Sequence, residues 1–134
     1  MADNGKRHVH EERVRYAETD QMGVAHHAAF IVWFEAARSS LLRAQGSSYR
    51  DWEARGYSLP VSAVELRLLQ GARYEDVVAI TVWVERVRSR TVSFAYEARR
   101  QGEVLATGRT EHVLVAGGKP VRFTPELLTF FERP

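Results

Sequence analysis

The chain has 134 residues, 45% of them hydrophobic and 27% charged, which is the size and composition of one globular domain. It has no cysteine, which excludes disulfides and thiolate metal sites. Its net charge is +2, and its basic residues are scattered among acidic ones, which predicts a mixed surface without the basic face that nucleic acid requires. No run approaches the roughly 20 apolar residues of a membrane helix, and residues 1–14 lack an apolar signal core. We therefore expect a single cytoplasmic domain over residues 1–134 that binds neither nucleic acid nor membrane.

The first third of the chain predicts a strand followed by a long helix. Residues 1–10 are expected to be flexible, and alternation over 12–16 predicts a short strand with Val14 and Tyr16 on one face. Apolar residues then recur at helical spacing and predict a helix over 28–44 that is buried on most sides. These residues are Phe30, Trp33, Phe34, Ala37, Leu41 and Ala44. Gly46 is placed to end this helix, and a short second helix is expected over 48–54, closed by Gly56.

The remainder is predicted to be mostly strands. Alternating or β-branched apolar residues favour strands over 57–69, 77–87, 91–99 and 102–116, with a hairpin turn over 100–103. A final helix is expected over 125–132, with Thr124 as its cap and Pro125 in its first position. Strands joined in this order form an antiparallel sheet, and one long apolar helix must lie across its face. The fold class is therefore α+β.

The corner between the first strand and the long helix, YAETDQMGVAHHAAF (16–30), carries the residues suited to chemistry. Gly23 permits a sharp turn, and the first N–H groups of a helix lack partners and can polarise a carbonyl. Asp20 would stand beside them as a nucleophile or a general base. The structural alternative is that Asp20 and Gly23 only cap the helix.

The longer string VRYAETDQMGVAHHAAFIVWFEAAR (14–38) closely resembles the opening of the hotdog-fold acyl-CoA thioesterases of the 4-hydroxybenzoyl-CoA thioesterase, or YbgC-like, family. The resemblance continues through Leu59–Val61 and Ala72–Asp76. It implies a hotdog fold, in which an antiparallel five-stranded sheet wraps around a long central helix. It also implies an enzyme that hydrolyses an acyl-CoA thioester and needs no cofactor, since coenzyme A belongs to the substrate.

The resemblance assigns roles to the corner. Asp20 matches the catalytic carboxylate, the backbone N–H of His27 matches the donor to the thioester oxygen, and Gly23 matches the glycine of the turn. His26 and Phe30 stand where relatives often have tyrosine, and both could face the acyl pocket. Trp33 could line an aromatic acyl pocket, although helical spacing is more often typical of the core. A metal site formed by His26 or His27 with His112, His8 or His10 is disfavoured, because adjacent residues rarely point to one metal.

Two arginines and the assembly complete these expectations. Arg88 and Arg90 lie two residues apart and could clamp the phosphates of coenzyme A, or simply form a solvated edge.

The family's subunits pair so that each site lies between two chains, which implies a homodimer, and dimers often associate into a homotetramer. An acyl-carrier-protein thioester remains a possible substrate. The rival functions are a hydratase or dehydratase on the same fold and a non-catalytic module that binds acyl-CoA or acyl-carrier protein.

Overall fold

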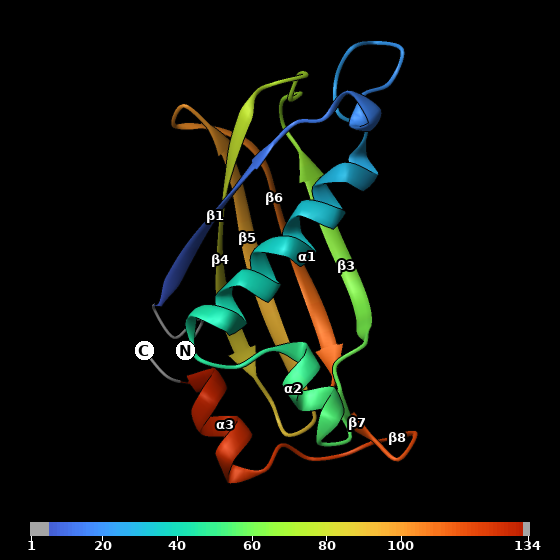
Figure 1. Ribbon diagram of the computed structural model, residues 1–134, viewed down its shortest axis with the longest axis vertical. Helices are drawn as coiled ribbons and strands as arrows, with labels where there is room; N and C mark the ends of the chain where they lie inside the picture. Colours follow the sequence, from blue (N-terminus) through green and yellow to red (C-terminus); the bar gives the residue numbers. More distant parts are fainter. Residues whose placement is uncertain (1–5, 133–134) are drawn as a thin grey trace.

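The computed structural model of the chain describes residues 6–132, and its elements are shown in Figure 1. In chain order they are β1 (Arg7–Arg13), the 3₁₀ turn η1 (Tyr16–Glu18), α1 (His27–Ala44), α2 (Tyr49–Ala54), β2 (Tyr57–Ser58), β3 (Val61–Leu68), β4 (Val77–Val87), β5 (Thr91–Arg100), β6 (Glu103–Val113), β7 (Val115–Ala116), β8 (Lys119–Pro120) and α3 (Pro125–Glu132). No helix within this part of the chain is long and apolar enough to cross a membrane.

One antiparallel sheet of five strands, in the order β1-β4-β5-β6-β3, forms the body of the molecule. The helix α1 lies across one face of this sheet. At one end of the sheet lie α2, α3 and a small sheet in the order β2-β7-β8 (Figure 1). The predicted α+β architecture and the single long helix are confirmed.

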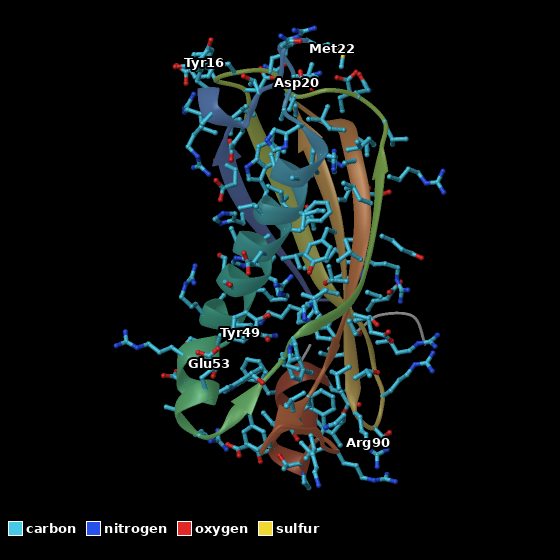
Figure 2. The ribbon with its side chains drawn as sticks, turned by 90° about the vertical axis from the view of Figure 1, so that its right-hand side faces the viewer. Tyr16, Asp20, Met22, Tyr49, Glu53 and Arg90 are labelled. Atoms are coloured by element: carbon cyan, nitrogen blue, oxygen red, sulfur yellow. The ribbon has the colours of Figure 1, made fainter. Side chains whose placement is uncertain are left out.

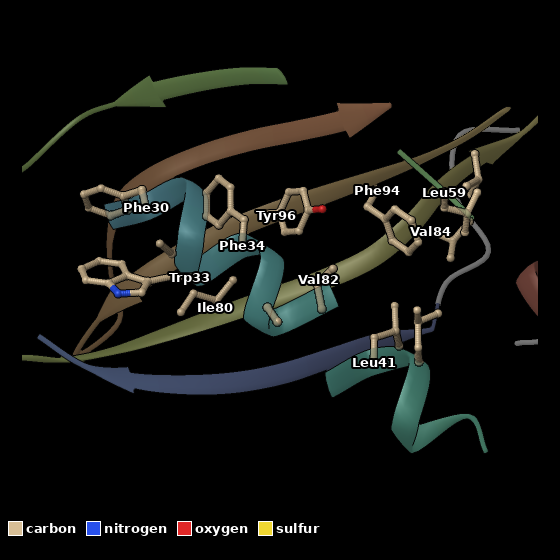
Figure 3. Close-up of a cluster of buried hydrophobic side chains, with 14 of the residues drawn as sticks. Phe30, Trp33, Phe34, Leu41, Leu59, Ile80, Val82, Val84, Phe94 and Tyr96 are labelled. Atoms are coloured by element: carbon tan, nitrogen blue, oxygen red, sulfur yellow. The ribbon is translucent and has the colours of Figure 1, made fainter. Parts of the chain in front are cut away.

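The core lies between α1 and the sheet. Phe30, Trp33 and Phe34 from α1 are all at most 1% exposed, and they face apolar side chains that alternate along β4 and β5 (Figure 3). The rings of Phe34 and Tyr96 stack with centroids 4.5 Å apart. This close contact depends on Gly108 in β6, where an added Cβ would lie 2.6 Å from the Phe34 ring. The apolar period read from the sequence therefore marks the face of α1 that packs on the sheet. The prediction that α1 is buried on most sides is wrong, because Ile31, Val32 and Ala44 are exposed on its other face.

The helix ends follow the predicted signals. Gly46 terminates α1 in the left-handed region at φ +93°, and Ser48 accepts the backbone N–H of Asp51 at the start of α2. Thr124 accepts the backbone N–H of Leu127 at the start of α3. The hairpin turn between β5 and β6 is also where it was predicted, with Gln101 and Gly102 both at positive φ.

The predicted first strand is wrong in its bounds. The strand runs from Arg7 to Arg13 and so includes residues 7–10, while residues 1–5 lie outside the described residues. Tyr16 begins η1 and is 77% exposed, whereas Val14 is buried. The strand was hard to recognise because its sequence, RHVHEER, is almost wholly polar, and backbone pairing with β4 holds it in the sheet. The predicted strands over 57–69 and 102–116 are each divided, into β2 and β3 and into β6 and β7.

The edge strand β3 is exposed on both of its faces. It pairs with β6 along one side, and no strand among residues 6–132 pairs with its other side. Val61, Val64 and Leu68 are 47%, 43% and 50% exposed. The alternation predicted for this strand is present, yet it does not bury an apolar face within one chain. An open edge with exposed apolar side chains is suited to pairing with another strand.

A chain of buried polar side chains crosses the core. Arg38 of α1 donates to the hydroxyls of Tyr49 and Tyr96, at 2.6 Å and 3.0 Å. The Tyr96 hydroxyl lies 2.6 Å from Thr110 Oγ1, which lies 2.8 Å from His112 Nε2. His112 Nδ1 lies 3.1 Å from the carbonyl oxygen of Leu59. Because a carbonyl only accepts, His112 carries a proton on Nδ1. If His112 is neutral, its Nε2 accepts from Thr110, Thr110 accepts from Tyr96, and each hydroxyl proton in this row has an acceptor.

This chain of hydrogen bonds predicts a pH dependence of stability. Burial and the charge of Arg38 lower the pKa of His112 from 6.5 to about 4. Between these values the unfolded chain binds a proton at His112 that the folded chain does not, so stability falls as the pH falls through this window. The free energy of unfolding should drop by about 3 kcal/mol between pH 7 and pH 4 from this group alone, measured by urea denaturation.

The control is His112→Gln, whose amide can still donate to Leu59 and accept from Thr110 but does not titrate. Its free energy of unfolding should depend less steeply on pH between 6.5 and 4. Equal slopes in the two proteins would show that folding does not lower the pKa of His112.

Candidate active site

The turn that precedes α1 holds Asp20 in a fixed position. The backbone N–H of Asp20 donates to the Val24 carbonyl and the N–H of Gly23 donates to the Asp20 carbonyl, both at 2.9 Å. Gly23 adopts φ +82°, which a side chain would strain. The carboxylate oxygen Oδ1 of Asp20 accepts the Met22 N–H at 2.9 Å, while no described residue donates to Oδ2. Asp20 is exposed, so one carboxylate oxygen is held and the other is available (Figure 2).

Glu18 ties this turn to the core, a role that sequence analysis missed. One of its carboxylate oxygens accepts the indole N–H of the buried Trp33 at 2.9 Å, and the other accepts the Arg15 N–H at 2.8 Å. The backbone carbonyl of Glu18 also accepts the N–H of His26 at 3.0 Å. Glu18 and Trp33 are 15 positions apart, and no local motif in the sequence indicates their contact.

The start of α1 presents unpaired N–H groups beside the Asp20 turn. His26 is the N-cap residue and its side chain makes no capping hydrogen bond; the first turn of α1 contains no acidic residue. No described residue accepts the backbone N–H of His27. The side chains of His26 and His27 are both exposed, and their rings lie 6.5 Å apart. The helix start therefore offers a donor with partial positive charge at the protein surface.

Arg73 is a second residue that sequence analysis did not place at this corner. A Cβ on Gly23 would lie 3.3 Å from Nη1 of Arg73, so the guanidinium covers the turn glycine. The backbone of Arg73 forms a bridge to Val24. No carboxylate among residues 6–132 lies within 4.0 Å of this guanidinium, and Asp76 instead pairs with Arg100 at 2.9 Å. Arg73 therefore brings a positive charge next to the Asp20 turn, and this charge also acts on Asp76.

Two predicted substrate-binding residues lie elsewhere than expected. Phe30 and Trp33 are 1% and 0% exposed, with ring centroids 4.8 Å apart in the core. Neither side chain reaches the surface of the single chain, so their role as substrate contacts stays a prediction. Helical spacing placed both residues correctly on the core face of α1, and the Trp33 indole supports the corner through Glu18.

Arg88 and Arg90 do not join Asp20 within one chain. Both are exposed in the turn between β4 and β5, and Figure 2 shows Arg90 at the end of the molecule opposite Asp20. The two arginines can therefore bind the phosphates of a substrate at the Asp20 site only if they belong to a second chain.

Histidines and acids do not gather into a metal site in the described part of the chain. His8 bonds Ser40 at 2.7 Å, His10 bonds Glu12 at 2.6 Å, and His112 is committed to Thr110 and Leu59. The corner itself combines a carboxylate, a nearby helix-start N–H and an arginine. This set can activate water or attack a carbonyl carbon and can stabilise the resulting oxyanion.

Comparisons with known proteins identify relatives over nearly the whole chain. Residues 14–131 match the family described as the thioesterase-like superfamily. YneP of Bacillus subtilis is 30% identical over 92% of this chain and 94% of its own length. The acyl-CoA thioesterase YbgC of Haemophilus influenzae is 28% identical over 98% of this chain and 97% of its own.

Solved structures agree with this relationship. The hypothetical protein TT1821 from Thermus thermophilus superposes with a TM-score of 0.89 at 37% identity, covering 92% of this chain and 95% of its own. The DHNA-CoA thioesterase from Staphylococcus aureus also has a TM-score of 0.89, at 31% identity, covering 95% of this chain and 89% of its own.

The support that Glu18 gives to the corner can be measured as a coupling energy. Glu18→Ala leaves the buried Trp33 N–H without its acceptor and should lower the free energy of unfolding by about 2 kcal/mol. In a Trp33→Phe background, which has no N–H to satisfy, Glu18→Ala should cost at least about 1 kcal/mol less. Glu11→Ala, an exposed position, is the control. Equal costs in both backgrounds would contradict this account of Glu18.

Proposed function

This chain belongs to the thioesterase-like superfamily, and we propose that it is an acyl-CoA thioesterase that uses Asp20 as its catalytic carboxylate. The reaction adds water to the thioester carbonyl and breaks the C–S bond. Its products are a free carboxylic acid and the thiol of coenzyme A. The observation that carries this assignment is the free Oδ2 of an exposed Asp20 beside an unpaired helix-start N–H.

Asp20 and the start of α1 have different roles in the proposed reaction. Asp20 attacks the carbonyl carbon or takes a proton from the attacking water. The backbone N–H of His27 donates to the carbonyl oxygen as negative charge develops on it, and the partial positive charge of the helix start adds to this stabilisation. Gly23 provides the backbone conformation that aims the carboxylate, and the exposed His26 ring borders the path of the substrate. We propose no cofactor for this chemistry.

The active form is proposed to be a homodimer, with a homotetramer as the further assembly. The support is the open, apolar edge of β3, which a second copy would cover by antiparallel pairing of β3 with β3. Such pairing runs the two sheets together and turns one chain end for end relative to the other. The Arg88–Arg90 turn of one chain then lies at the same end of the dimer as Asp20 of its partner.

The substrate carrier is proposed to be coenzyme A, and an acyl-carrier protein is the alternative carrier. Arg88 and Arg90 of the partner copy are the candidates for the phosphates, because guanidinium groups bind phosphate oxygens in pairs. Acyl-CoA made by activation of carboxylic acids in the cytoplasm is the expected source of substrate.

Asp20→Asn separates chemistry from capping. Asparagine keeps the size of aspartate and its oxygen acceptor for the Met22 N–H, and it caps about as well, so the melting temperature should not change. The negative charge is lost, and kcat for acyl-CoA hydrolysis should fall by at least about 100-fold. The measurement is steady-state hydrolysis with detection of the released thiol. If kcat stays within a few-fold of the unsubstituted enzyme, Asp20 is structural.

Replacing Arg88 and Arg90 with alanine tests the phosphate clamp. The double variant should raise KM for an acyl-CoA much more than KM for the matching thioester of N-acetylcysteamine, which carries no phosphates. The salt dependence of KM for acyl-CoA should also become flatter, since ion pairs with phosphate are screened by salt. Arg50→Ala, an exposed arginine on α2, is the control. Equal changes in KM for the two thioesters would show that the arginines do not bind the phosphates of coenzyme A.

A further inference from the structure

A cleft of about 490 Å³ opens between α1, α2 and the N-terminal end of β3. It is lined by Glu35 and Arg38 of α1, Tyr49 and Glu53 of α2, and residues 58–61. Leu59, Pro60 and Val61 provide an apolar wall, while the two helices provide polar groups. Figure 2 shows Tyr49 and Glu53 in the half of the molecule away from Asp20.

Arg38 lies at the base of this cleft and is only 5% exposed. A buried arginine is usually paired with a carboxylate. Here no carboxylate among residues 6–132 lies within 4.0 Å of it, and its hydrogen bonds go to the hydroxyls of Tyr49 and Tyr96. The cation is therefore held by neutral groups, and its field acts on whatever enters the cleft.

The Tyr49 hydroxyl has a proton to offer to a ligand. It accepts the Nε–H of Arg38 at 2.6 Å, and no described residue accepts its own proton. Burial raises the pKa of Tyr49 to about 12, so the hydroxyl stays protonated at neutral pH. Donation by the neighbouring guanidinium polarises this O–H and strengthens it as a donor. A ligand that carries an oxygen atom can accept this hydrogen bond.

The charges around the cleft favour a neutral oxygen. Glu35 and Glu53 line it together with Arg38, so the lining carries two negative charges and one positive charge. A carboxylate or phosphate on the ligand would be repelled by the two glutamates. A hydroxyl accepts from Tyr49 and can donate to a glutamate, which suits both groups.

The cleft and the Asp20 turn lie at opposite ends of β3. The turn contacts the segment that follows the C-terminal end of the strand: Ala25 donates to the Ala72 carbonyl at 2.7 Å, and Val24 bridges to Arg73. The cleft adjoins Pro60 and Val61 at the N-terminal end. Antiparallel pairing of two β3 strands about a two-fold axis near their middle brings the cleft of one chain beside the Asp20 turn of the other.

We propose that this cleft receives the far end of the acyl group whose thioester is hydrolysed by the partner's Asp20, and that Tyr49, positioned by Arg38, selects acyl groups that end in a neutral hydroxyl over plain alkyl groups. This proposal rests on the proposed function and adds the class of acyl group. Tyr49 is its specificity residue, and Arg38 is a positioning residue that acts through the Tyr49 hydroxyl.

The first test is a binding measurement that needs no turnover. Calorimetry compares S-alkyl-CoA thioethers, which cannot be hydrolysed, with their ω-hydroxy counterparts at butyl, hexyl and octyl length. One added hydrogen bond corresponds to about threefold to tenfold tighter binding of the hydroxylated ligand at the chain length that reaches Tyr49. Tyr49→Phe should abolish this preference, and Tyr57→Phe, a nearby tyrosine outside the cleft lining, should keep it.

The results of this binding test distinguish a failure of the specificity proposal from a failure of the proposed thioesterase activity. No preference at any length in the unsubstituted protein overturns the specificity proposal, as does a preference that survives in Tyr49→Phe. A tighter ω-carboxylate thioether would overturn the preference for a neutral group. A preference in binding without hydrolysis of any acyl-CoA would remove the proposed activity and leave the cleft assignment standing.

The second test asks whether the cleft and Asp20 come from different chains. Tyr49→Phe chains are refolded with an excess of Asp20→Asn chains, and hydrolysis of 6-hydroxyhexanoyl-CoA is compared with that of hexanoyl-CoA. One of the two sites in a mixed dimer then combines Asp20 of one chain with the intact Tyr49 of the other, while the second site carries both substitutions and is inactive. The hydroxyacyl preference should therefore return. A preference that stays lost in the mixture, or a monomer by light scattering, would overturn the shared site.

Discussion

The packing of α1 on the sheet is the constraint on which the rest of the structure depends. Phe30, Trp33 and Phe34 are buried against β4 and β5, and this fixes both the direction of the helix and the place where it begins. The helix start cannot satisfy its first N–H groups internally. Because the packed face is formed close to that start, these unpaired groups are held in a fixed position beside the Asp20 turn. Stability and the candidate chemistry therefore come from the same helix.

The corner is rigid because several elements hold it at once. Glu18 links it to the Trp33 indole in the core, Ala25 bonds to Ala72, and Arg73 covers Gly23. An exposed carboxylate on a mobile loop would sample many positions and would lose rotamer entropy in each catalytic event. Here Oδ1 of Asp20 is engaged by the backbone and Oδ2 is left open, which is the preorganised arrangement that electrostatic catalysis needs.

In a single chain the Asp20 carboxylate lies far from the cleft and from the arginine turn. The carboxylate lies at one end of β3, while the cleft with Arg38 and Tyr49 and the turn with Arg88 and Arg90 lie towards the other. The exposed edge of β3 runs between these regions and carries apolar side chains that the chain does not bury. The proposed two-fold pairing along that edge would both cover the strand and bring the separated parts together.

The sequence by itself determined the class of fold, the long helix and its packed face, the turn and cap residues, and Asp20 with the helix start as the candidate reactive corner. These features are local, because helical period, glycine turns and capping residues act over a few positions. Tertiary structure decided the rest: that polar β1 is a strand, and that Glu18 and Arg73 support the corner. It also placed Arg38, Tyr49, Tyr96, Thr110 and His112 in one buried chain of hydrogen bonds. Three of these four hydrogen bonds join residues 11 to 58 positions apart, and no period or motif in the sequence encodes a pairing that only the folded sheet creates.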